Sequence, residues 1–248
     1  MGEDSNIAWC SHTFNPWLGC AKISAGCKNC YAETWGTRFN IKWGLNGDRR
    51  RTKTWSDPIR WNKAAKESGI RQRVFCASLA DVFESDSRLD EFRKDLFPLI
   101  EKCDSLDWLL LTKRPENMLS MVPWKGAWPK HVWALTTAEN QEMAERRASY
   151  LVKVPASVRG LSCEPLLGPL DISKEYMQDI DWVIAGCESG AGRRPFDIEW
   201  ARSLKQQSDV AKAAFFMKQI PKEGNKKGVT DNMDDFPEDL RVREFPNG

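Results

Sequence analysis

Six short apolar segments, about 30 residues apart, most constrain how this chain can fold. They occupy 73–78, 108–112, 132–136, 159–163, 182–186 and 213–217. Continuous apolar segments of about five residues are typical of strands that are buried on both faces. Helix-like stretches lie between them, at 89–102, 139–151 and 198–208. This alternation predicts an α/β fold built from repeated βαβ units with a parallel sheet.

Length and composition agree with one large domain. The chain has 248 residues, of which 41% are hydrophobic, so it can bury a substantial core. We expect this domain to span 1–220, and the polar segment 221–248 to form a tail or a cap. There is no signal peptide and no apolar segment long enough to span a bilayer, which favours a cytoplasmic protein without a membrane partner.

Three cysteines lie close together in the segment WLGCAKISAGCKNCYAE, which occupies 17–33. Cys20, Cys27 and Cys30 follow the pattern C-x6-C-x2-C. Three soft thiolates without an adjacent fourth cysteine suit an iron–sulfur cluster in which one iron keeps an open position. An open iron can bind a small molecule, so the pattern favours an enzyme.

Two other interpretations of these cysteines remain open. A zinc site needs a fourth ligand, which His12 or Cys10 could supply. The three residues could also be ordinary thiols. Disulfides are disfavoured, because a chain of this length does not need them and nothing marks it as secreted.

Polar residues follow five of the predicted strands. They include Ser78 and Asp81, Lys113 and Arg114, Glu139 and Asn140, Glu164, and Glu188 and Ser189. In a parallel barrel the carboxyl ends of the strands meet at one rim, where active sites lie. The sequence therefore predicts a site at that rim. There is no phosphate-binding P-loop, no G-x-G-x-x-G motif and no histidine in a hydrolase-like pattern, so kinases, dehydrogenases and common hydrolases lack support.

Residues 35–63 are rich in basic and aromatic side chains. The basic ones are Arg38, Lys42, Arg49, Arg50, Arg51, Lys53, Arg60 and Lys63; the aromatic ones are Trp35, Phe39, Trp43, Trp55 and Trp61. Aromatic faces alternating with cations could stack bases and hold phosphates. The alternative, which we favour, is a surface cover whose tryptophans pack on the domain while its basic side chains face water.

Six stretches of the chain carry a resemblance to a known group of enzymes. They are FNPWLGCAKISAGCKNCYAE, ASLADVF, LLTKRPENM, LSCEPLLGPLDI, DWVIAGCESGAGRRP and FFMKQ. The chain resembles the radical S-adenosylmethionine (radical SAM) superfamily, and more closely a phage-associated group of three-cysteine radical-SAM-like proteins. The common superfamily spacing is C-x3-C-x2-C, whereas the closer group shares the longer first gap seen here. The resemblance implies a partial (βα)6 TIM-like barrel with the cluster-binding loop after a first strand near 7–10 or 13–14.

The resemblance also implies a set of ligands and roles. Cys20, Cys27 and Cys30 would hold a 4Fe-4S cluster that binds S-adenosylmethionine and cleaves it to a radical, with an external flavodoxin-type or ferredoxin-type reductant. The cofactor-binding candidates are Ser78 and Asp81 for the methionine amino group, Lys113 and Arg114 for its carboxylate, and Glu164, Thr136 and Asn140 for the ribose. The catalytic candidates are Cys187 and Glu188, and the substrate-binding candidates are Ser189, Arg193, Arg194 and Lys218.

Several functional possibilities remain at this point. The substrate could be a nucleobase or nucleotide, as in phage DNA hypermodification, or a small metabolite or peptide. A non-enzymatic zinc module is the third possibility. Cys76, Cys163 and Cys187 follow or end predicted strands, and they are more plausible as core thiols than as a second metal site.

Overall fold

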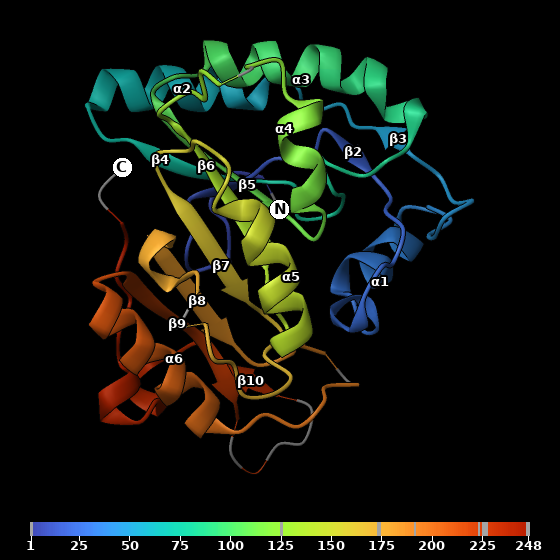
Figure 1. Ribbon diagram of the computed structural model, residues 1–248. Coiled ribbons are helices and arrows are strands. Elements are labelled where there is room, and N and C mark those ends of the chain that lie inside the picture. Colours follow the sequence, from blue (N-terminus) through green and yellow to red (C-terminus); the bar gives the residue numbers. More distant parts are fainter. Residues whose placement is uncertain are drawn as a thin grey trace. The chain divides into compact units, whose positions relative to one another are not determined.

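The computed structural model describes residues 2–124, 126–172, 175–190, 192–222, 224 and 228–246. The chain forms two compact units (Figure 1). Unit 1 contains Met1–Ile23, Ala32–Ala134 and Pro155–Ser157, and unit 2 contains Ser24–Tyr31, Leu135–Val154 and Val158–Gly248. Both units combine helices with mostly parallel strands, so the predicted α/β class is confirmed at this level.

Unit 1 contains three parallel strands in the order β1-β4-β5. Their bounds are His12–Thr13 for β1, Gln72–Cys76 for β4 and Leu106–Thr112 for β5. β4 and β5 lie where the apolar segments predicted strands, and β1 overlaps the second position expected for the first strand. A separate antiparallel pair joins β2 (Trp17–Leu18) to β3 (Arg50–Arg51).

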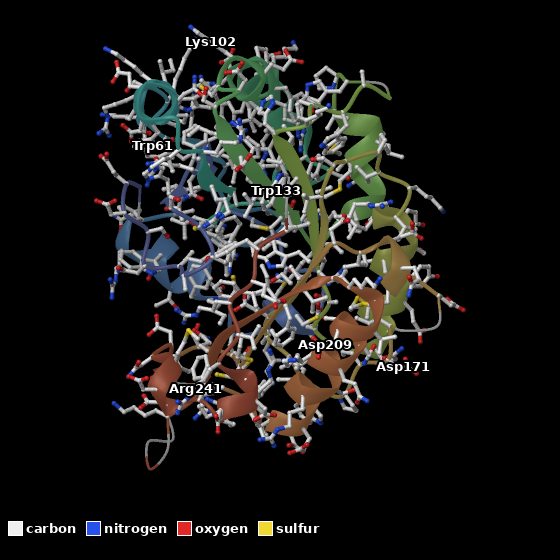
Figure 2. The ribbon with its side chains drawn as sticks, turned by 90° about the vertical axis from the view of Figure 1, so that its left-hand side faces the viewer. Trp61, Lys102, Trp133, Asp171, Asp209 and Arg241 are labelled. Carbon is white, nitrogen blue, oxygen red and sulfur yellow. The ribbon has the colours of Figure 1, made fainter. Side chains whose placement is uncertain are left out.

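Four α-helices accompany these strands: α1 (Tyr31–Arg38), α2 (Asp57–Ser68), α3 (Asp90–Lys102) and α4 (Met118–Met121). The 3-10 helices η2 (Ser87–Leu89) and η3 (Pro115–Asn117) precede α3 and α4. α2 ends at Gly69, whose φ of +70° is the left-handed geometry that glycine adopts at helix ends. α3 buries an apolar stripe that includes Leu96 and Ile100, while Lys102 at its end points outward (Figure 2).

Unit 2 has the strand order β7-β8-β9-β10. β7 (Arg159–Cys163), β8 (Trp182–Gly186) and β9 (Ala214–Pro221) are parallel, and β10 (Val229–Thr230) is antiparallel to β9. The boundary between the units falls within β6 (Val132–Thr137). β6 to β9 all lie at the predicted apolar segments. Their buried residues are continuous rather than alternating, as expected for strands covered on both faces.

The helices of unit 2 begin at side-chain caps. Asn140 caps α5 (Gln141–Leu151) by accepting a hydrogen bond from Met143 N–H, and Asp197 caps α6 (Ile198–Ala211) in the same way. α6 packs on β8 and β9, as Figure 1 shows. Two further 3-10 helices, η1 (Ala25–Cys27) and η4 (Met177–Asp179), complete this part of the unit.

The predicted tail 221–248 belongs to unit 2 wherever it is described. It contains β10 and the 3-10 helices η5 (Met233–Asp235) and η6 (Glu238–Leu240). Phe236 and Leu240 are buried, and Arg243 forms a β-bridge with Phe216 of β9. The segment therefore packs against the last strands of its unit.

Across the described ranges, no helix is both long and apolar enough to cross a membrane.

Candidate functional site

Asp81 is the centre of a buried polar cluster in unit 1. One carboxylate oxygen accepts hydrogen bonds from Thr112 Oγ1 at 2.6 Å and from Phe83 N–H at 3.0 Å. The other accepts from Arg114 Nη1 at 2.8 Å and from Lys113 N–H at 3.3 Å. Both oxygens are thus engaged by the protein. The predicted contact with a methionine amino group stays a prediction, whereas the observed role of Asp81 is to fix Arg114.

Arg114 extends from the end of β5 to the first cysteine. Its Nη2 donates to the carbonyl oxygen of Ala21 at 2.8 Å, and its Nη1 lies 3.8 Å from Cys20 Sγ. Burial lowers the pKa of this guanidinium, but the carboxylates of Asp81 and Glu84 outweigh burial and raise it. A permanent cation therefore lies against the sulfur of Cys20. The predicted contact between Arg114 and a methionine carboxylate is not tested by these contacts.

The Cys20 thiol is protonated at neutral pH in the metal-free chain. Burial, together with the negative charges of Asp81 and Glu84, raises its pKa to about 12, and Arg114 only partly opposes this. Metal binding at such a sulfur displaces a proton, so metal affinity increases with pH.

Glu84 is a member of this cluster that the sequence analysis missed. Its carboxylate accepts two hydrogen bonds from Arg49, at 2.6 and 2.8 Å, and one from Ala21 N–H at 3.0 Å. The Arg49 side chain is only 1% exposed. Arg93 binds the same segment by donating to the carbonyl oxygens of Val82 and Glu84. The buried ion pair between Glu84 and Arg49 thus holds the backbone next to Cys20, through the hydrogen bond from Ala21 N–H.

Ser78 lies next to the same cluster and binds Asn15. Asn15 Nδ2 donates to Ser78 Oγ at 2.9 Å, while Asn15 Oδ1 accepts from Leu79 N–H at 2.6 Å. Both side chains are buried. Asn15 therefore orders the segment after β4, and the predicted role of Ser78 toward a cofactor stays a prediction.

In unit 2, Glu139 holds the segment that carries the second cysteine. Glu139 is fully buried, and its carboxylate accepts from Gly26 N–H at 3.1 Å and from Arg147 Nη1 at 2.5 Å. Arg147 Nη1 also donates to the carbonyl oxygen of Thr137 at 2.8 Å. A Cβ on Gly26 would lie 2.9 Å from the Glu139 carboxyl carbon. Glycine is therefore needed where the backbone approaches this carboxylate.

Glu188 makes a second clamp on the same segment. It forms a two-point ion pair with Arg194 and accepts a hydrogen bond from Asn29 Nδ2 at 3.0 Å. Arg194 Nη1 donates to the carbonyl oxygen of Ala25 at 2.9 Å, and Asn29 also donates to Gly192 O at 2.8 Å. Burial alone would raise the pKa of Glu188, but Arg194 and Asn29 hold it below its usual value.

The observed contacts thus give Glu188 and Arg194 a use that the sequence analysis did not anticipate. Both are committed to the cysteine-bearing segment, whereas we had expected a catalytic carboxylate and a substrate-binding cation. Asn29 was not considered at all. It lies between Cys27 and Cys30 of the motif, which was the available signal. The predicted roles of Glu188 and Arg194 toward a substrate stay predictions.

A further polar group is formed by residues just after β7 and β8 and by one within β9. Lys218 Nζ is 2.8 Å from Glu164 Oε1, and both side chains are partly exposed. A Cβ on Gly186 would lie 2.8 Å from the same Glu164 oxygen. Cys187 is buried beside them, and burial raises the pKa of its thiol to about 12. The fold thus brings together Glu164 and Lys218, a predicted cofactor-binding residue and a predicted substrate-binding residue.

The remaining predicted residues have more modest environments. Thr136 is buried within β6, and Asn140 caps α5. Three others are half-buried: Lys113, Ser189 and Arg193. The positive charge of Arg193 lowers the pKa of the Cys187 thiol, in opposition to burial. Cys27 is buried with its sulfur 3.9 Å from Ser24 Oγ, and Cys30 is half-buried. Burial also raises the pKa of Cys76 and of Cys163.

All eight cysteines are free thiols. In the part of the chain that is described, no three His, Cys, Asp or Glu side chains are arranged to hold a metal ion. This applies to Cys76, Cys163 and Cys187 as well as to the cysteine motif. The second metal site therefore receives no support.

The basic region 35–63 divides into two sets of side chains. Arg49, Arg51, Arg60 and Lys63 form ion pairs with Glu84, Asp95, Glu3 and Glu67, and Trp61 is buried. Exposed Arg51, Arg60 and Lys63 and buried Trp61 agree with the cover that we favoured, whereas the buried side chain of Arg49 does not. Arg38, Lys42, Arg50 and Lys53 are exposed, and within the described residues none of them forms an ion pair.

Among curated proteins and among solved structures, none matches the chain. One family does match, over residues 4–238, under the description "Protein of unknown function (DUF5131)". Because this match covers nearly the whole chain, the protein belongs to the DUF5131 family.

Proposed function

We propose that the protein is a radical SAM enzyme whose cluster is held by Cys20, Cys27 and Cys30. The observation that carries the proposal is the support given to the segment around these cysteines. Within unit 1, Ala21 is held by Glu84 and Arg114. Within unit 2, Ala25, Gly26 and Asn29 are held by Arg194, Glu139 and Glu188.

Buried charges make this support informative. Removing a carboxylate from water costs several kcal/mol unless it is paired and hydrogen-bonded. Glu84, Glu139 and Glu188 are all buried and each is paired with an arginine. A segment that only connected two elements would not need three such groups. Supporting contacts of this kind are typical where ligand side chains must be held in a defined geometry.

The donor set fits an iron–sulfur cluster. It consists of three thiols without a fourth, which leaves one iron available for a cofactor. The metal would have to gather these thiols, as is common when binding is coupled to local ordering. A zinc site with His12 as the fourth ligand is less well supported, because the His12 ring stacks on Trp61 and its Nε2 is engaged with Gln72 at 2.5 Å.

When bound, such a cluster would supply the electron that cleaves S-adenosylmethionine to a 5′-deoxyadenosyl radical, with the electron coming from a flavodoxin-type or ferredoxin-type reductant. Arg114 would offset the negative charge that Cys20 brings to the cluster, and Asp81 would hold Arg114 there. Glu164 would meet the ribose of the cofactor, and Lys218, whose Nζ is 2.8 Å from Glu164 Oε1, would meet a polar substrate.

The proposal also specifies the type of α/β fold and the class of substrate. The fold would be the partial (βα)6 barrel of the superfamily, in which the strand ends form the rim. The substrate would be a nucleobase or nucleotide. A small metabolite or peptide remains the alternative.

The test is anaerobic purification followed by analysis of iron, sulfide and zinc. We expect about four irons per chain and a visible absorbance band that bleaches on reduction. Cys20→Ala, Cys27→Ala and Cys30→Ala should each lose iron, while Cys103→Ala, which removes a buried thiol outside the motif, should keep it. Reduced protein should then release 5′-deoxyadenosine from S-adenosylmethionine.

Two outcomes would contradict the proposal. A colourless protein with one zinc per chain would favour a zinc module. Full iron content and activity in any one of the three motif variants would show that the ligand assignment is wrong.

A further inference from the structure

The exposed part of the basic region contains a stacked pair of aromatic side chains. Trp35 in α1 is 37% exposed, and Phe39, just after the helix, is 43% exposed. Their rings lie 6.5 Å apart at an angle of 21°. The other tryptophans of the region are less exposed, and Trp61 is buried. Two large aromatic faces are thus left at the surface of unit 1.

Two arginines contact this aromatic pair, and a lysine follows it closely in the chain. The guanidinium of Arg38 is 4.5 Å from the Trp35 ring centroid, and Arg50 donates a hydrogen bond to the carbonyl oxygen of Phe39. Lys42 follows Phe39 in the chain and is exposed. Among the described residues, none of these three forms an ion pair with a carboxylate. Arg49, Arg51, Arg60 and Lys63 of the same region are all paired.

The nearby acidic residues offset only part of this positive charge, because Asp48 keeps its charge while Glu33 is paired elsewhere. Asp48 is engaged by the backbone N–H of Lys42 at 2.7 Å, and Glu33 is paired with Lys22 at 2.5 Å. The surface therefore combines exposed aromatic faces with cations whose charge is available to a ligand. Unpaired bases stack on aromatic faces, and arginine and lysine hold phosphates. A duplex hides the faces of its bases, so this arrangement favours a single strand.

We propose that this surface, formed by Trp35, Arg38, Phe39, Lys42 and Arg50, binds single-stranded nucleic acid. The inference deepens the proposed function and rests on it only in identifying the strand as the enzyme's substrate. Binding itself requires neither the cluster nor S-adenosylmethionine. The two ideas can therefore fail independently.

The test measures the fluorescence anisotropy of a labelled oligonucleotide of about 20 unpaired nucleotides with the full-length protein. We expect affinity that falls steeply between about 50 and 200 mM salt. Trp35→Ala should weaken binding about tenfold or more, and Trp35→Phe should retain most of it because a stacking face remains. Lys42→Gln should weaken binding and reduce the salt slope by about 1.

Lys63→Gln is the matched control, because it removes the same charge from a paired and exposed lysine on α2. It should leave the affinity and the salt slope nearly unchanged. The circular dichroism spectrum of each variant verifies that it is folded. The inference is overturned if no oligonucleotide binds, if Trp35→Ala binds as well as the parent, or if a matched duplex is preferred. The inference is also overturned if acidic proteins bind instead of oligonucleotides and their binding depends on Trp35.

The Cys30→Ala protein separates this inference from the proposed function. Oligonucleotide binding by this variant, with loss of iron, supports both ideas. Release of 5′-deoxyadenosine by a parent protein that binds no oligonucleotide refutes the surface and leaves the enzyme proposal intact.

Discussion

Replacement of Glu139 by glutamine should destabilise the protein strongly, although the two side chains have nearly the same shape. Glu139 is fully buried and pairs with Arg147, whose side chain is only 3% exposed. The glutamine oxygen can still accept the hydrogen bond from Gly26 N–H. What is lost is the charge that compensates the buried guanidinium.

The expected magnitude follows from this loss. Two unit charges about 4 Å apart attract each other by about 4 kcal/mol at an effective dielectric constant near 20. Breaking one partner of a buried ion pair costs about 3–5 kcal/mol in measured cases. The carbonyl oxygen of Thr137 remains as an acceptor for Arg147, so we expect the lower part of that range for Glu139→Gln.

Urea denaturation, followed by tryptophan fluorescence and by circular dichroism, measures this effect. With a denaturant slope of about 3 kcal/mol per molar, the midpoint should fall by about 1 M or more. Because the chain contains two compact units, the two probes must give coincident transitions before a free energy of unfolding is derived.

Arg147→Met and the double variant Glu139→Gln/Arg147→Met complete a mutant cycle. Each single change leaves one buried group without its partner, whereas the double change removes both charges. The double variant should therefore lose less than about 1.5 kcal/mol, since paired charges can often be replaced by uncharged side chains at little cost. Simple addition of the two single losses would refute the reasoning, and so would a loss below about 1 kcal/mol for Glu139→Gln.

Gly19→Ala should lower the melting temperature far more than Gly44→Ala. Both glycines have a φ of +109°, so the backbone strain is matched. Only a Cβ on Gly19 would meet a backbone atom, the carbonyl oxygen of Asp48 at 2.0 Å. Equal losses in the two variants would show that this close approach is unimportant. The free energy of unfolding should fall as pH rises above about 9, because folding raises the pKa of Cys20 from 9.0 to about 12. Between these two values the unfolded chain loses the thiol proton while the folded chain keeps it, which favours the unfolded state. Urea midpoints of the metal-free parent and of Cys20→Ala between pH 8 and 10 test this, and the variant should show the smaller fall. Glu188 has a lowered pKa, so its contribution is present above its ordinary value of 4.5 and is lost as pH falls through the lower folded value. Glu188→Gln should accordingly flatten the acid side of the stability profile, and an unchanged acid side would contradict the clamp.

Much of the fold could be predicted from the apolar pattern. β4 to β9 lie at the six predicted segments, and α3, α5 and α6 lie close to the predicted helical stretches. Buried strands leave a strong signal because apolar residues predominate in them. The two-residue strands β1, β2, β3 and β10 are too short to leave a pattern.

The site was predicted less completely. The sequence identified the cysteine motif and the polar residues after the strands. It did not show what those residues contact. Glu188 was expected to face a substrate, but Asn29, which is 159 positions away in the chain, and Arg194 use its carboxylate. Glu84 was missed because its partner Arg49 lies 35 positions earlier, in a region that had been interpreted as a surface cover.

The sequence by itself determined the α/β class, the positions of the main strands and helices, and the residues with metal-binding or ionic chemistry. These properties depend on residue types and on local spacing, which the printed chain contains. Only the tertiary structure decided which carboxylates hold the cysteine-bearing segment and which cations of the basic region remain unpaired. Each of those outcomes depends on a partner brought close by folding, because a buried charge must be compensated by whichever opposite charge the fold places beside it.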